Sequence, residues 1–143
     1  MADEAKTFPD NLITDRSEAD VKAGNERGTY NASDLNRVAD AARRIREILY
    51  ALGYNRTPAI PDRIWTVNEI PRESELRAHH EAVIGQDVLN YAKKKHPLPG
   101  TLSNLGIDGA NNIERFIYDT YFAAERIPTG YIFSGEIYGG ENF

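Results

Sequence analysis

The sequence contains no cysteine and no long apolar run. Without cysteine, the chain can form neither a disulfide nor a thiolate site for zinc or redox chemistry. A membrane-spanning helix needs about 18 or more consecutive apolar residues, and the sequence has no such stretch. The first residues are acidic, whereas a secretory signal begins with basic and then apolar residues. We therefore expect a protein that is made in the cytoplasm and has no membrane partner.

An excess of positive charge is also missing. The net charge at pH 7 is -5, so the chain as a whole does not attract nucleic acid or an anionic membrane. A short basic run, Lys93 to His96, lies at the C-terminal end of an expected helix, where cations compensate the helix dipole. Nucleic acid is therefore not an expected partner.

Apolar residues at three- and four-residue steps predict three long helices. The first is expected to begin at Asn31 or Ser33, whose side chains can accept the first free backbone N–H groups. Gly53 is expected to end it in a left-handed conformation. A shorter helix is expected before it, capped by Thr14 or Asp15 and ended by one of the glycines that follow.

The second long helix is expected to begin around Pro71 and to continue to about Lys94. Gly85, in the middle of this span, predicts close packing or a bend, because glycine is unfavourable inside a helix. The third is expected to start at Asp108 as its cap and to end before Pro128. The side chains expected to be buried where the helices meet are Leu35, Val38, Ile45, Leu49, Leu76, Val83, Ile113 and Ile117.

Prolines dominate the segment between the first two long helices. Pro58, Pro61 and Pro71 lack a backbone N–H and disfavour a helical residue before them, so residues 54–71 are expected to be extended. We call this segment the strap, and we expect Trp65 to hold it against the helices.

These elements predict a mainly α fold, a small bundle of about three helices. We expect an extended N-terminal arm at residues 1–12 and a helical body at residues 13–128, which includes the strap. Residues 129–143 should form a C-terminal extended or β ribbon. Hydrophobic residues make up 41% of the chain, which suits a modest core with several extended segments.

No pattern of catalytic residues is recognisable in the sequence. His79 and His80 are adjacent, so on a helix they point about 100° apart and do not converge on one metal ion. We place His80 on the apolar face and His79 on the solvent side. Ser134 lacks the strained-turn context of a nucleophile, and no glycine-rich segment matches a phosphate-binding loop. We therefore expect no enzyme activity, no cofactor, no metal, and no cleft that gathers several titratable groups.

The last residues, GYIFSGEIYGGENF, combine aromatic and β-branched residues with glycines. This composition favours a strand, but the rest of the chain offers no strand to pair with, and a single strand is not stable in water. The ribbon therefore either packs on its own helices or docks on another chain. We favour docking, and the expected partner-binding residues are Tyr131, Phe133, Ile137, Tyr138 and Phe143.

Three motifs, YNASDLNRV, DGANNIERF and FSGEIYGGE, resemble a family of small virion-associated proteins. The family is encoded by tailed phages and prophages of Gram-positive bacteria, usually among the tail and baseplate genes. The resemblance covers most of the chain in the same order. It implies a structural protein of the virion whose partners are other tail or baseplate proteins, with further copies of itself in the assembly. It transfers no catalytic residue.

Two other functions stay open from the sequence. One is a phage-encoded adaptor or regulator that binds a host protein or a nucleic acid. The other is a small enzyme, for which a bound metal or a polar, buried pocket would be the distinguishing feature.

Overall fold

The structure is a computed structural model, and it describes residues 7–25, 28, 30–88, 92–102 and 105–126. The predicted mainly α class is confirmed, and the described residues contain no strand. The helices are α1 (Glu18–Ala23), α2 (Ala32–Ala51), α3 (Glu73–Ile84), α4 (Ala92–Lys95) and α5 (Ile107–Glu125).

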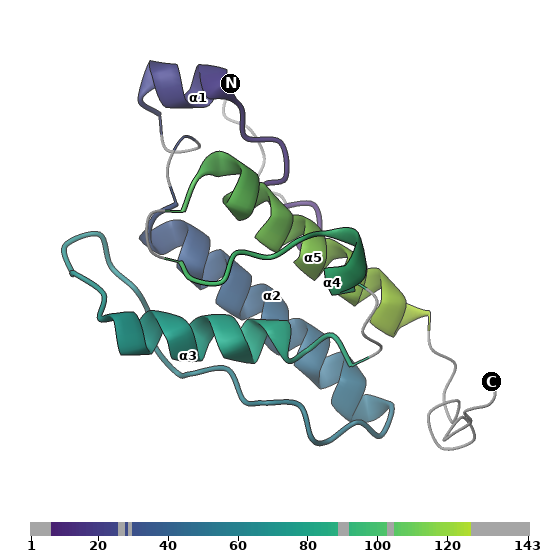
Figure 1. The fold of residues 1–143 in the computed structure, drawn as a ribbon. Helices are drawn as coiled ribbons and strands as arrows, with labels where there is room; N and C mark the ends of the chain where they lie inside the picture. Colours follow the sequence, from purple (N-terminus) through teal and green to yellow (C-terminus); the bar gives the residue numbers. More distant parts are fainter. Residues whose placement is uncertain (1–6, 26–27, 29, 89–91, 103–104, 127–143) are drawn as a thin grey trace.

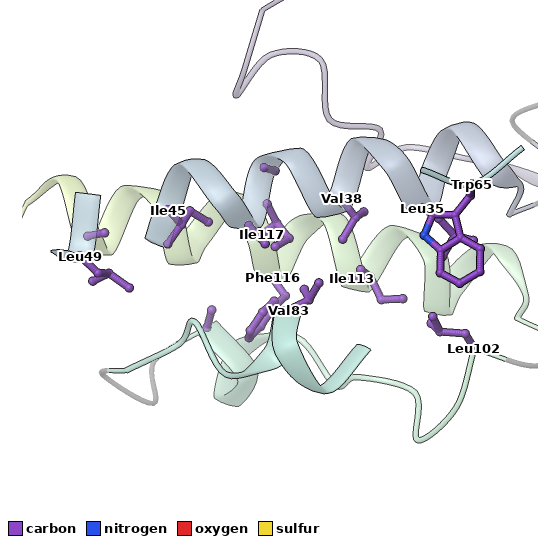
Figure 2. Close-up of a cluster of buried hydrophobic side chains, with 14 residues drawn as sticks. Leu35, Val38, Ile45, Leu49, Trp65, Val83, Leu102, Ile113, Phe116 and Ile117 are labelled. Carbon is purple, nitrogen blue, oxygen red and sulfur yellow. The ribbon is translucent and has the colours of Figure 1, made fainter. Parts of the chain in front are cut away.

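Helices α2 and α5 lie side by side and run in the same direction, and they make the largest contact between helices (Figure 1). Helix α3 packs across α2, and the short α4 packs on α5. The core fills the space between α2, α3 and α5, where Phe116 and Ile117 face Ile45 and Val83 (Figure 2). Parallel pairing of α2 and α5 places the start of one helix beside the start of the other.

Helix α2 has the bounds that its local sequence predicts. The Asn31 side chain accepts hydrogen bonds from the backbone N–H groups of Ser33 at 3.0 Å and Asp34 at 3.4 Å. The Asp34 carboxylate accepts one in return from the backbone of Asn31 at 2.8 Å, which completes a capping box. Gly53 has a φ of 103° just after the helix, as expected of a residue that ends it.

The second predicted helix is two helices in the structure. Helix α3 ends at Ile84, and the next residue, Gly85, lies so close to the strap that a Cβ atom there would collide with the ring of Pro58. The side chain of Gln86 then donates to the carbonyl oxygens of Ala82 and Pro58, each at 2.9 Å. Close packing at the glycine was predicted correctly, whereas the continuation to Lys94 is wrong.

The starts of two helices also differ from the predictions. Helix α5 is capped by Gly106, so Asp108 lies in its first turn, where its negative charge interacts favourably with the helix dipole. Helix α1 is capped by Ser17 instead of Thr14 or Asp15, and it ends at Gly24 with a φ of 68°.

The predicted core is confirmed except at one position. Leu76 is only half-buried, whereas the other seven expected residues are buried. Trp65 is also buried, so the strap is held against the helices as expected. In the segment before α1, Phe8 packs edge-on against Tyr121 of α5, with ring centroids 4.6 Å apart.

Candidate functional site

Four charged side chains from segments far apart in the sequence meet in the interior. They are Arg16, Asp34, Arg37 and Glu114, and we call them the buried ion cluster. The carboxylate of Glu114 lies 2.6 Å from Nη2 of each arginine, and Asp34 contacts both arginines as well. The side chains of Arg16 and Glu114 have no exposed surface. Two positive and two negative charges therefore neutralise one another away from solvent.

The same cluster fastens the N-terminal segment to α5 through its backbone. The N–H of Ile13 donates to Oε1 of Glu114 at 2.9 Å. The N–H of Arg16 donates to Oδ1 of Asn111 at 3.0 Å, and Nδ2 of Asn111 donates back to the carbonyl oxygen of Arg16 at 3.0 Å. Residues 13–16 are consequently held along α5 by side chains that α5 supplies.

The electrostatics of the cluster favour a charged Arg37 and a neutral Tyr30. Burial alone lowers the pKa of Arg37, but the hydrogen bonds and charges of Glu114 and Asp34 outweigh it and raise the pKa. Burial and the same two carboxylates raise the pKa of Tyr30. The opposite charges pair with one another, so we interpret the cluster as a structural link between α2, α5 and the N-terminal segment.

This cluster was not predicted from the sequence, although Asp34, Arg37 and Glu114 lie within two of the motifs that carry the resemblance. Glu114 comes four residues after Ala110 and three before Ile117, so it occupies a position on the buried face of α5. A fully buried glutamate needs a charge partner. A charge in the apolar stripe was thus the signal that could have revealed the cluster.

A second group of polar residues surrounds an open hollow of about 540 Å³ between residues 9–14, α4 and α5. Nε2 of His96 lies 2.6 Å from Oδ2 of Asp119, and Nζ of Lys95 lies 3.3 Å from the same oxygen. The titratable residues that line the hollow are Asp10, Lys95, His96, Arg115, Tyr118 and Asp119.

The expectation that no cleft gathers several titratable groups is therefore wrong. The hollow exists because α3 ends early, which lets the following segment return against α5 and brings Lys95 and His96 to Asp119. The basic run was expected to compensate a helix end, and in the structure it also joins α4 to α5 by ion pairs.

The two adjacent histidines are both buried, so the placement of His79 on the solvent side is wrong. His79 packs edge-on against Trp65, with ring centroids 6.0 Å apart, because the strap covers this side of α3. His80 donates from Nε2 to the carbonyl oxygen of Pro99 at 2.8 Å. Within the described ranges, no three or more His, Asp or Glu side chains are grouped so that they could hold a metal ion.

The third candidate site comprises the end of the strap and the residue after it, residues 62–72, which we call the strap tip. Its base is fixed to α2 by Trp65, whose backbone N–H donates to Oδ1 of Asn36 at 2.8 Å and whose carbonyl oxygen accepts from Nδ2 at 2.9 Å. The guanidinium of Arg63 lies 3.9 Å from the centre of the Trp65 ring. The same guanidinium forms ion pairs with Glu69 and Glu75, each at 3.1 Å.

This framework presents aliphatic side chains to solvent. Ile64 is 77% exposed, Val67 is 81% exposed and Ile70 is 93% exposed. Single exposed apolar residues are common, but three on one short, internally bonded loop are characteristic of an interaction site. The loop is ordered by its own contacts, so a partner would bind it with little loss of conformational entropy.

The predicted docking ribbon cannot be compared with the structure. Its partner-binding residues Tyr131, Phe133, Ile137, Tyr138 and Phe143 lie outside the described residues.

In the described part of the chain, no helix has both the length and the apolar character to cross a membrane. Comparison of the chain with family models, curated proteins and solved structures finds no match.

Proposed function

We propose that this protein is a structural component of a phage virion, in the tail or baseplate region, and that it acts by docking to other proteins. The observation that carries the docking function is the strap tip, where Ile64, Val67 and Ile70 are exposed on a loop ordered by Arg63 and Trp65. The resemblance of the three motifs to virion-associated proteins supplies the class of assembly.

The use of charge in the molecule supports a docking function over a catalytic one. The buried ion cluster neutralises its own charges and joins three segments of the chain. Its arginines and carboxylates are therefore occupied in holding the fold together. The apolar surface, in contrast, is directed outward on a fixed loop, as in protein interfaces that are organised before binding.

The C-terminal ribbon is the second docking element of the proposal, with Tyr131, Phe133, Ile137, Tyr138 and Phe143 as its contacts. Aromatic side chains dominate binding energies at interfaces, because they bury large areas with few rotatable bonds. We propose other tail or baseplate proteins and further copies of this chain as partners, and the virion as its location.

Mass spectrometry of purified particles tests this function directly. The polypeptide should be present at a fixed ratio to the other tail proteins. A chain truncated after Thr129 should keep its helical circular dichroism but fail to enter particles. Absence of the full-length polypeptide from particles would contradict the virion function, and unfolding of the truncated chain would contradict an independent docking ribbon.

A second candidate function, a small enzyme, is favoured only by the hollow around His96 and Asp119. A carboxylate that orients a histidine is a common arrangement in general acid–base catalysis. The same contacts join α4 to α5, which explains them without a reaction. His96→Asn separates the two functions, since a docking protein should still enter particles with this change.

A further inference from the structure

We propose that two copies of the chain associate symmetrically, with the strap tip of each copy seated in a hollow beside the strap of the other. This inference deepens the proposed homo-oligomer by naming its contact surfaces. The hollow lies between the outer side of α2 and the strap, and its volume is about 400 Å³. It is lined by Arg43, Arg46, Glu47, Tyr50, Ala59 and Ile60.

The walls of this hollow suit aliphatic side chains. Tyr50 is 47% exposed, and Ile60 and Ala59 supply apolar surface from the strap. The guanidinium of Arg46 lies 4.6 Å from the centre of the Tyr50 ring and donates to the hydroxyl group at 3.0 Å. Tyrosine and arginine are the residue types that are enriched where interface energy is concentrated.

Charges around the two surfaces are complementary. The strap tip carries two acidic and two basic side chains, and one of its carboxylates, that of Asp62, is exposed and lies two residues before Ile64. The hollow carries one more basic than acidic side chain. Within the described residues, Arg46 donates to two neutral oxygens, of Tyr50 and Thr57, so its charge can meet a carboxylate of another copy.

The position of the two surfaces along the chain favours a closed pair. Ile60 of the hollow and Ile64 of the strap tip are separated by only three residues of the same extended strap. A two-fold axis beside the strap would let both copies give a tip and receive one, and such reciprocal contacts are the commonest arrangement in homo-oligomers. The occupant of the hollow is therefore a second copy of this chain.

The test is sedimentation equilibrium of the purified full-length protein over a range of concentrations. We expect a monomer–dimer equilibrium. Ile64→Asp should raise the dissociation constant about tenfold or more, as should Ala59→Trp, which fills the hollow. The matched control is Val21→Asp, because Val21 is an exposed apolar residue on α1, outside both surfaces. It should leave the dimer unchanged.

Mixing the two variants makes the test specific. Ile64→Asp keeps an intact hollow and Ala59→Trp keeps an intact tip, so an equimolar mixture should form heterodimers through one of the two contacts. Each variant alone should remain largely monomeric. Circular dichroism of each variant should match the parent, because Ile64 and Ala59 are exposed.

Either of two results would overturn the inference: a monomer at every concentration up to about 1 mM, or a dimer that tolerates both variants. A dimer that is lost only on truncation after Thr129 would assign the contact to the C-terminal ribbon. Mass spectrometry of purified particles tests the virion function separately from this dimer. A virion protein can lack the dimer, and a dimer formed through the strap can exist outside a virion.

Discussion

The guanidinium of Arg16 lies 2.6 Å from the carboxylate of Glu114, which is 98 residues further along the chain. Neither side chain is exposed to solvent. Ions removed from water are costly unless their partners compensate them, so each of these residues requires the other. This relationship ties the N-terminal segment to α5, and it makes the cluster sensitive to a change of charge.

Glu114→Gln should therefore destabilise the protein strongly. The change keeps the size of the side chain but leaves two arginines with a single carboxylate, and loss of a buried partner costs about 3–5 kcal/mol. The free energy of unfolding in urea measures the effect. The control is Asp40→Asn, which removes an exposed partner of Arg43 and should have little effect. Equal effects of the two variants would contradict the structural function of the cluster.

Leu49→Ala should lower the free energy of unfolding by about 2–5 kcal/mol, as truncation of a buried leucine leaves a cavity. Leu49 is 1% exposed and lies near the C-terminal end of the contact between α2 and α5. Chemical denaturation followed by circular dichroism provides the measurement. A variant as stable as the parent would show that the helical phase of α2 is wrong.

His79 should make the protein less stable in mild acid. Burial, together with the positive charges of His80 and Arg43, lowers its pKa from 6.5 to about 4. The unfolded chain takes up a proton as the pH falls below about 6.5, whereas the folded chain does so only near pH 4. Stability should therefore decrease across this window, by about 3 kcal/mol at most.

The comparison with His79→Leu isolates this contribution. The variant should lose most of the change in stability between pH 6.5 and pH 4.5 that the parent shows. Urea unfolding at several pH values is the measurement. If both proteins show the same pH dependence, the histidine is not neutral in the folded state.

The strap tip should become less ordered at a lower pH than the one at which His79 takes up its proton. Hydrogen bonds from Arg63 lower the pKa of both Glu69 and Glu75 from 4.5. The two ionised carboxylates therefore stabilise the strap tip above about pH 4.5, and this stabilisation is lost as the pH falls through the lowered pKa values. Trp65 is the only tryptophan of the chain, so its fluorescence reports the strap. Its emission should change in this acidic range.

Arg63→Gln should produce a similar change in Trp65 fluorescence at neutral pH, because it removes both the ion pairs and the cation over the indole ring. Arg77→Gln serves as the control, since Arg77 is exposed and contacts only the first turn of its own helix at Glu73 among the described residues. Emission from the Arg63 variant that matches the parent would show that Arg63 does not order the tip.

Local sequence determined the helices with regular apolar spacing. The stripe from Leu35 to Leu49 and the capping residue Asn31 specify α2, and these features act within a few residues of one another. The prolines of the strap likewise determine an extended backbone without help from the rest of the chain. These parts could be predicted because their causes are local.

Tertiary structure decided where α3 ends, which side of it is buried and which charges are inside. Pro58 of the strap lies against Gly85 just after the end of α3, and His79 is buried because Trp65 covers it. The charge of Glu114 is stable in the interior only because Arg16 and Arg37 arrive from distant segments. Packing and desolvation depend on the partners that the fold brings together, and local sequence does not contain them.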